Sequence, residues 1–253
     1  MHLLIRISAA LGLLATIPAH AGKVPLLVTY IDKPPYYYQP GAATPPTGFL
    51  LNYVVRVLDQ AGIAAHYELR PAVRALAEIE HASSPLCSVG WFKTAERERY
   101  GNYSAPLYRD PPMMLVTRPE SLRKLKPFAS AASLVNDPTL QPGTVAGFTY
   151  GAYLDGLLRG RSARIDASAQ TLQQNLAKVI FGRVDYIFMD QAELHYWSRQ
   201  PGLQGHPVAS LSLPDLPAGN LRYLLCSKQV DDATLQRINR AIASLPKPMP
   251  PGQ

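Results

Sequence analysis

Two residue types that bind anions follow an apolar run of the sequence. Thr94 and Arg97 stand just after Cys87–Phe92 (CSVGWF), which has the composition of a buried strand. An arginine guanidinium presents a planar fork of donors that matches a carboxylate, which a lysine ammonium does not. Arg97 also belongs to the charged run Glu96–Arg99. The pattern therefore leaves two interpretations, an anion site at the edge of a cleft and a solvated loop, and on its own it favours the loop.

A second charged residue, Asp190, follows the apolar run Val184–Met189. It could face a ligand or simply cap the helix expected over Gln191–Arg199. The sequence has no HExxH, CxxC, GxSxG or phosphate-binding glycine-loop pattern. Of the six histidines, His195 alone lies near these positions, and its place on the helix is expected to face solvent. We therefore expect no catalytic residue, no cofactor and no metal.

The elements that must position these residues alternate between strand and helix. Apolar runs and helical spacing predict strands at 24–31, 65–70 and 87–92, with helices at 49–60 and 72–82 between them. A second unit is predicted with strands at 112–118, 144–148, 163–167 and 184–189 and helices at 150–158, 171–181 and 191–199. A strand at 221–227 and a helix starting at 231 or 232 follow. This alternation predicts an α/β fold of mainly parallel sheets covered by helices, and the two units fit two lobes better than one sheet.

Composition and the first residues indicate an exported globular protein. Hydrophobic residues make up 47% of the chain and charged residues 17%, which is typical of a folded domain. Residues 1–21 have one charged side chain, Arg6, then an apolar run with Ala19 and Ala21 before the expected cleavage, so they predict a signal peptide and a periplasmic protein. The net charge of +7 favours an anionic or zwitterionic partner, but Lys and Arg are scattered, which argues against nucleic acid.

Four stretches, in order, resemble the extracellular solute-binding proteins of polar amino acid ABC transporters (solute-binding family 3). They are YIDKPPYYYQP with TGFLLNYVVRVLDQAGI, then KTAERERYGNYSAPLY, VAGFTYGAYL and LAKVIFGRVDYIFMDQAELHYW. The resemblance covers nearly the whole mature chain. It departs at Leu50 and Asn52, where the family usually has acidic residues, and at SSPLC, which replaces a Gly-x-x-Asp.

The resemblance implies the type II periplasmic binding protein fold, with a ligand cleft between two lobes. Lobe 1 would comprise 22–110 and 218–245, lobe 2 would comprise 111–217, and 246–253 would be a flexible tail. Ligands of such sheets bind at the carboxyl ends of the strands. The chain would cross between the lobes at 109–111 and return at 216–220.

The resemblance also implies roles for single residues. Arg97 would bind a ligand carboxylate, assisted by Thr94 and by Thr149 at the start of a helix. Asp190 would hold an α-ammonium from the opposite lobe. The other expected ligand-binding residues are aromatic: Tyr30, Tyr36, Tyr37, Trp91, Phe92, Phe148 and Tyr150. Phe92 and Phe148 stand where small polar residues are usual, which predicts a more aromatic pocket than that of a typical amino acid binder.

The resemblance implies a non-catalytic, monomeric receptor that closes its lobes around a small amino acid or carboxylate and delivers it to an ABC permease. The alternatives are an enzyme on the same fold, such as a dehydratase of prephenate-like acids, and a sensory binding protein without transport. The enzyme would need an acid or base placed in the cleft. The sequence does not identify the ligand.

Cys87 and Cys226 are the two cysteines. An even count in an exported chain favours a disulfide, with two buried free thiols as the alternative. In the resembled topology, the strand that re-enters lobe 1 lies beside that lobe's third strand. These strands carry the two cysteines here, so the resemblance implies a Cys87–Cys226 disulfide.

Overall fold

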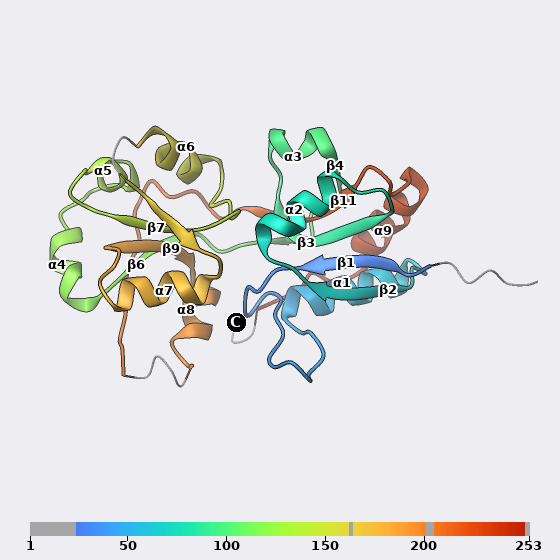
Figure 1. Cartoon of the computed structure of the whole chain (residues 1–253), viewed down its shortest axis with the longest axis horizontal. Coiled ribbons are helices and arrows are strands. Elements are labelled where there is room, and N and C mark those ends of the chain that lie inside the picture. The colour runs from blue at the N-terminus through green and yellow to red at the C-terminus, as the bar shows by residue number, and fades with distance from the viewer. Residues whose placement is uncertain (1–23, 162–163, 201–204, 251–253) are drawn as a thin grey trace, which may run out of the picture.

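The computed structural model describes residues 24–161, 164–200 and 205–250, which form two lobes side by side (Figure 1). Each lobe is a sheet flanked by helices, which confirms the predicted fold class. The predicted signal peptide, residues 201–204 and the last three residues of the predicted tail lie outside the described residues. None of the helices in the described part of the chain has the length and apolar character needed to span a membrane.

Lobe 1 is built on a sheet of strand order β2-β1-β3-β11-β4, with β5 paired to β11. Its strands are β1 (Leu26–Tyr30), β2 (Ala65–Leu69), β3 (Leu86–Phe92), β4 (Gly101–Tyr103), β5 (Tyr108–Arg109) and β11 (Leu221–Ser227). Its helices are α1 (Phe49–Gln60), α2 (Ala72–Glu80), α3 (Ala95–Tyr100) and α9 (Asp232–Ser244). β1 runs parallel to β2 and β3, whereas β11 returns from lobe 2 and is antiparallel to β3, β4 and β5.

Lobe 2 has the strand order β10-β6-β9-β7-β8. Its strands are β6 (Met113–Thr117), β7 (Pro142–Val145), β8 (Asp166–Ala169), β9 (Tyr186–Asp190) and β10 (Ala209–Leu211). Its helical segments are η1 (Pro119–Ser121), α4 (Leu122–Leu125), α5 (Ala131–Asn136), α6 (Ala152–Gly160), α7 (Leu172–Ile180) and α8 (Gln191–Trp197). β7 is parallel to β8 and β9, and β6 is antiparallel to β9 and β10.

Two short links join the lobes. The chain leaves lobe 1 after β5 and enters lobe 2 at β6, and it returns between β10 and β11. The links touch each other: Gly219 has φ +44°, and a Cβ there would lie 1.7 Å from the carbonyl oxygen of Asp110. Only a glycine permits this approach, because any side chain would collide with the opposing backbone.

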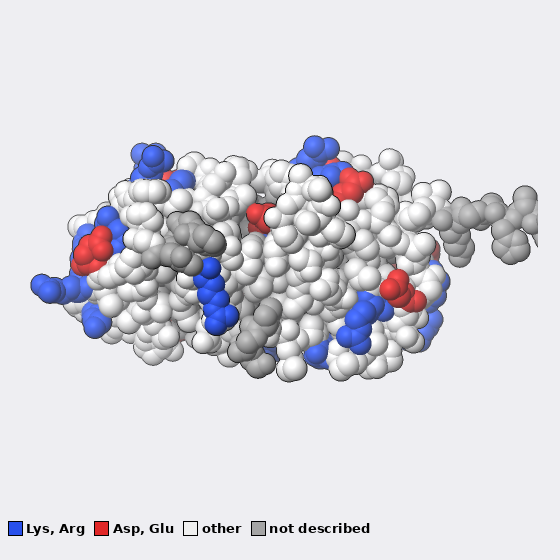
Figure 2. Space-filling view, turned by 90° about the horizontal axis from the view of Figure 1, so that it is seen from below, with Lys and Arg blue, Asp and Glu red and all other residues white. Residues whose placement is uncertain are grey.

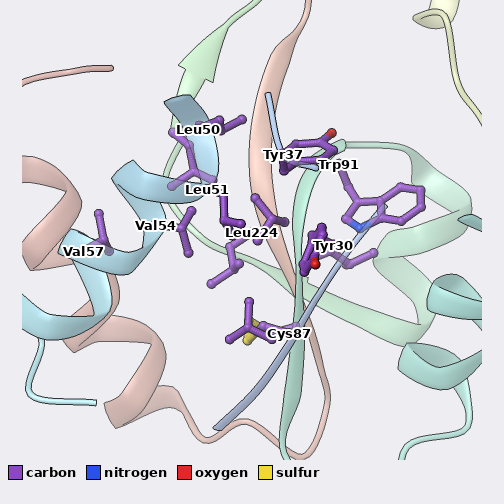
Figure 3. Packing of buried hydrophobic residues seen from close by; sticks show 14 of the residues in the cluster. Tyr30, Tyr37, Leu50, Leu51, Val54, Val57, Cys87, Trp91 and Leu224 are labelled. Carbon is purple, nitrogen blue, oxygen red and sulfur yellow. A yellow bond between two sulfur atoms is a disulfide. The ribbon is translucent and has the colours of Figure 1, made fainter. Parts of the chain in front are cut away.

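The core of lobe 1 lies between its sheet and α1. One face of α1 carries the buried residues Leu50, Leu51, Tyr53, Val54, Val57 and Leu58. Figure 3 shows several of these side chains directed at the strands, beside Leu224, Tyr30 and Cys87. Helical spacing thus places an apolar stripe of α1 on the sheet, as the sequence pattern predicts. On the face of the molecule in Figure 2, Lys and Arg are spread over both lobes in separate spots.

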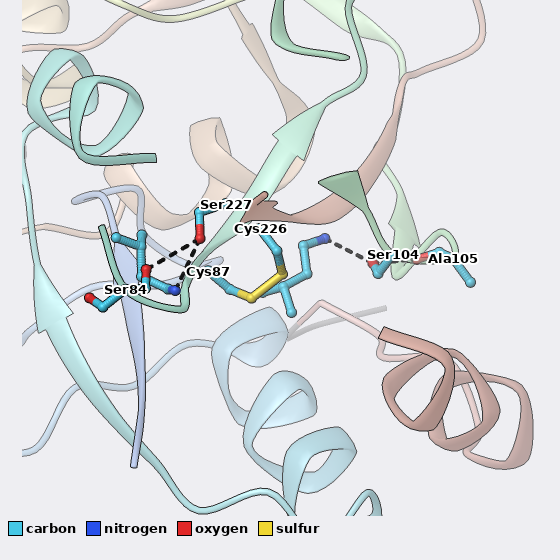
Figure 4. The surroundings of a disulfide bond; sticks show 8 residues. Ser84, Cys87, Ser104, Ala105, Cys226 and Ser227 are labelled. Carbon is cyan, nitrogen blue, oxygen red and sulfur yellow. Dashed lines mark hydrogen bonds between the residues drawn. A yellow bond between two sulfur atoms is a disulfide. The ribbon is translucent and has the colours of Figure 1, made fainter. Parts of the chain in front are cut away.

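A disulfide joins Cys87 of β3 to Cys226 of β11, which confirms the predicted pair (Figure 4). The two cysteines are 139 residues apart in sequence and directly opposite each other in the antiparallel register. Ser227 Oγ accepts a hydrogen bond from the Leu86 amide and donates one to the Ser84 carbonyl, which adds contacts at the same place. The bond therefore ties the returning strand to the N-terminal part of lobe 1.

We expect the double variant Cys87→Ala/Cys226→Ala to lose about 2–4 kcal/mol of unfolding free energy, because the disulfide restricts a long loop of the unfolded chain. Urea unfolding of the variant and the oxidised protein measures this difference. Wild-type protein unfolded with a reductant is the control and should resemble the variant. A variant as stable as the oxidised wild type would contradict the expectation.

Candidate functional site

A cleft lies between the lobes at the ends of β3 and β9. Its lining residues share a position at the facing edges of the two lobes: Ile31, Lys33, Tyr37, Gly90, Trp91, Phe92, Arg97, Met113, Phe148, Thr149, Tyr150, Leu172, Phe188, Glu193 and Arg222. The cavity volume is about 30 Å³, room for only about two water molecules at roughly 10–15 Å³ each. Side chains of the two lobes therefore fill the cleft, and the lobes must part before a small molecule can enter.

Arg97 crosses the cleft from lobe 1. Its Nη2 donates to Thr149 Oγ1 at 3.0 Å and to the Gly147 carbonyl at 3.4 Å, both in lobe 2. Its Nη1 donates to the Phe92 carbonyl at 3.2 Å, and the guanidinium lies over the Trp91 ring. The side chain is buried, at 6% exposure, so the solvated charge run is excluded for Arg97 itself.

The fold places Arg97 by means of a short helix that begins where β3 ends. Thr94 is the N-cap of α3, and its hydroxyl accepts a hydrogen bond from the Arg97 amide at 3.2 Å. Thr94 is therefore a cap that fixes the first turn. The neighbours of Arg97 in the charged run point outward, since Glu96, Glu98 and Arg99 are exposed.

An ion pair also bridges the lobes. Lys33 Nζ of lobe 1 contacts Glu193 Oε1 of lobe 2, and both side chains are almost fully buried. Burial lowers the pKa of Lys33 to about 7, with help from Arg222 and against the opposing effect of Asp190 and Asp110. The Glu193 carboxylate in direct contact also favours the protonated form, so we treat Lys33 as an ammonium.

Asp190, at the end of β9, is fully buried and hydrogen-bonded. Its Oδ2 accepts from the Tyr36 hydroxyl at 2.8 Å and its Oδ1 accepts from the Glu193 amide at 3.0 Å. The Asp190 amide in turn donates to Glu193 Oε2 at 3.0 Å, which completes a capping box at the start of α8. Asp190 therefore caps α8, which is one of the two roles that the sequence suggested for it. The predicted role toward a ligand ammonium stays a prediction.

Arg222 and Asp110 form a second buried pair beside the cleft. Arg222 Nε and Nη2 each lie 2.6 Å from an oxygen of Asp110, a two-pronged contact. Arg222 Nη1 also donates to the Gly90 carbonyl at 2.7 Å and to the Tyr37 hydroxyl at 3.2 Å. Burial raises the pKa of Asp110 to about 6, although the adjacent guanidinium opposes this shift. The pair joins β11 to the first interlobe link.

The structure brings together most of the predicted ligand-binding residues. Seven of them line the cleft: Tyr37, Trp91, Phe92, Arg97, Phe148, Thr149 and Tyr150. The other four, Tyr30, Tyr36, Thr94 and Asp190, do not belong to the lining. Tyr30 lies within the lobe 1 core (Figure 3). The predicted helix at 150–158 begins later, at Ala152 with Gly151 as N-cap, so Thr149 stands in the loop before it.

Sequence analysis missed Lys33, Glu193 and Arg222, the charged residues that accompany Arg97 in the lining. A signal existed for two of them. Arg222 is a lone charge inside the apolar run LRYLLCS, and a charge in a buried strand requires a partner. Glu193 stands three residues after Asp190, the spacing of a capping box. Lys33 precedes Pro34 in a loop, where nothing in the sequence indicates burial.

Gly90 leaves room for the Tyr37 side chain, whose hydroxyl accepts a hydrogen bond from Arg222. It has φ +83°, and a Cβ there would lie 2.4 Å from the Tyr37 ring. We expect Gly90→Ala to lower the unfolding free energy by about 1–3 kcal/mol through overpacking. Gly156→Ala is the control, since Gly156 lies in α6 with nothing within 4 Å of the added Cβ, and it should stabilise slightly. Thermal unfolding compares the two, and equal melting temperatures would refute the expectation.

Comparison with known proteins identifies the fold. No family model and no curated protein matches the chain. The solved structure of an ancestral arginine-binding protein bound to arginine matches with a TM-score of 0.69 at 14% identity, over 87% of this chain and 91% of that chain. The chain has the type II binding-protein fold. The arginine-, lysine-, histidine-binding protein ArtJ from Geobacillus stearothermophilus matches with a TM-score of 0.67 at 17% identity, over 87% and 88% of the two chains.

The type II binding-protein fold is also that of a protein described as an ancestral amino acid-binding precursor of cyclohexadienyl dehydratase. That structure matches with a TM-score of 0.66 at 15% identity, over 87% of this chain and 88% of the other. A shared fold does not by itself give the function, which has to be argued from the site. Among the described residues, no group of three His, Cys, Asp or Glu side chains could hold a metal ion.

Proposed function

We propose that this chain is a periplasmic solute-binding protein that closes its two lobes on a small carboxylate-bearing ligand. The observation that supports this most is Arg97. It is buried in the cleft, it reaches from one lobe to the other, and its hydrogen bonds go to neutral oxygens. A guanidinium in this position can bind a carboxylate through two parallel hydrogen bonds once the lobes part.

The contacts between the lobes indicate how the cleft opens and closes. Lys33–Glu193, Tyr36–Asp190 and Arg97–Thr149 all join lobe 1 to lobe 2, so they must break when the cleft opens. The two links at 110–112 and 212–220 are the places where a hinge can act. The lobes then close around the ligand and remove it from water, as in hinged binding proteins.

The experiment is a thermal-shift screen of amino acids and small carboxylates, followed by small-angle scattering on any compound that binds. A ligand should raise the melting temperature, because it stabilises only the folded chain. It should also change the scattering profile as the lobes close on it. If no compound raises the melting temperature, the proposal is wrong.

We assign the chain to uptake, with an ABC permease as its partner, on the basis of the fold shared with substrate-binding proteins of amino acid ABC transporters. Loss of uptake of the identified ligand in a strain without this chain tests that assignment, and unchanged uptake would favour a sensory role. Export by the signal peptide predicts a mature chain that begins at Gly22. Mass spectrometry of protein from the periplasm checks this start.

An enzyme on the same fold is the alternative. Lys33, Glu193, Tyr37 and Tyr150 are the cleft residues that could transfer protons. Lys33 and Glu193 are each other's partner, and both tyrosine hydroxyls are hydrogen-bonded to groups of the protein. A dehydratase needs an acid or base that is free to act on the substrate. We therefore expect no turnover of prephenate-like acids.

A further inference from the structure

The acidic side chains in and beside the cleft are all engaged by groups of the protein. Glu193 contacts the ammonium of Lys33, and Asp110 is held by both prongs of Arg222. The two oxygens of Asp190 accept from the Tyr36 hydroxyl and the Glu193 amide. A ligand ammonium would therefore have to displace a group of the protein to reach a carboxylate.

The positive side chains that line the cleft do not all have acidic partners. Lys33, Arg97 and Arg222 are the cations that line the cleft, and two of them have acidic partners. In the part of the chain that the structure describes, no ion pair involves Arg97, whose guanidinium contacts carbonyl oxygens, a hydroxyl and the Trp91 ring. Asp190 is likewise bonded only to neutral groups, but it does not line the cleft, so Arg97 is the lining cation that is left for a ligand anion.

Apart from Gly90 and Thr149, the rest of the lining is aromatic or aliphatic. Six aromatic residues surround the charged groups: Tyr37, Trp91, Phe92, Phe148, Tyr150 and Phe188. Ile31, Met113 and Leu172 complete the wall. Such a lining favours an apolar ligand body, because burying an extra charge without a partner is costly.

We propose that the cleft selects a monocarboxylate with an uncharged, apolar body, and that the Lys33 ammonium occupies the place where an amino acid would present its own. This inference rests on the proposed function and narrows its ligand class. Arg97 binds the carboxylate, the aromatic wall holds the body, and Lys33 satisfies Glu193 from within the chain. An amino acid is disfavoured because its ammonium meets Lys33 and finds no free carboxylate.

The test uses three probes that share one skeleton, with affinities measured by calorimetry. They are 3-phenylpropanoate, which has only the carboxylate, L-phenylalanine, which has both groups, and 2-phenylethylamine, which has only the ammonium. The pairs butanoate with 2-aminobutanoate and propanoate with alanine repeat the comparison for smaller bodies. In at least one pair the carboxylate should bind at least about tenfold tighter than its amino acid, because like charges that are brought together cost several kcal/mol. The amine should not bind.

The variant Lys33→Met removes the internal ammonium and leaves Glu193 without its partner. We expect the preference for the carboxylate over its amino acid to fall at least about tenfold. Lys93→Met is the matched control, because Lys93 is an exposed lysine on the same lobe that pairs with Glu98, and its preference should stay that of wild type. If Lys33→Met does not fold, the wild-type comparison still decides the question.

The outcomes separate this inference from the proposed function. Amino acids that bind as tightly as, or tighter than, their matched carboxylates would overturn the inference and leave a binding protein. An unchanged preference in folded Lys33→Met would overturn the role of Lys33. Failure of every carboxylate and amino acid to bind would overturn both the inference and the proposed function.

Discussion

Replacing Arg222 with methionine is expected to lower the unfolding free energy by about 3–5 kcal/mol, because the change leaves the carboxylate of Asp110 buried without its partner. Asp110 is 3% exposed and Arg222 is 5% exposed, so water cannot replace the lost contact. The variant also removes donors from the Gly90 carbonyl and the Tyr37 hydroxyl. Urea unfolding followed by fluorescence measures the loss.

A second variant separates the ion pair from simple loss of packing. Arg222→Met/Asp110→Leu removes both charges, and it should recover much of the stability, since apolar residues can replace a buried pair at little cost. Arg109→Met is the control: Arg109 is the neighbour of Asp110, is exposed and bonds the Gly219 carbonyl. A single Arg222→Met variant as stable as wild type would show that the pair does not hold this region together.

The spacing of apolar residues in the sequence predicted the long helices of the fold. Helical spacing identified α1 and α7, whose buried faces are long apolar stripes. Short elements with few apolar positions were not predicted. Among them are α4 and α5, the second of which begins with a Ser130 capping box. α2 buries Ala72, Ala75 and Ile79, and this face leaves the apolar side chain of Val73 54% exposed.

The candidate site also has residues that the sequence could locate and contacts that it could not. The resemblance located Arg97, Thr149 and the aromatic wall except Phe188, since their positions follow from where strands end. The partners of the charges could not be predicted, because Lys33 meets Glu193 across 160 residues of chain and only the docking of the lobes brings them together. Arg222 and Asp110 are likewise 112 residues apart. A charge in an apolar strand signals that a partner exists but not which residue it is.

Arg97→Ala should have the largest effect on binding. It removes the one lining cation that has no acidic partner among the described residues. We expect the affinity for the tightest-binding carboxylate of the panel to fall by about 2–5 kcal/mol, which is about 30-fold to several thousandfold. Arg97→Lys should restore little of it, since a point charge does not reproduce two parallel hydrogen bonds. Calorimetry on each variant gives the affinities.

Two comparisons distinguish ligand binding from a purely structural role of Arg97. Arg99→Ala changes an exposed arginine two residues along α3 and should bind like wild type. Arg97 also bonds Gly147 and Thr149 across the cleft, so the melting temperature without ligand should fall modestly in Arg97→Ala. If that temperature falls while the affinity is unchanged, Arg97 only joins the lobes. If the affinity falls in Arg97→Ala and not in Arg99→Ala, the buried guanidinium is where the carboxylate binds.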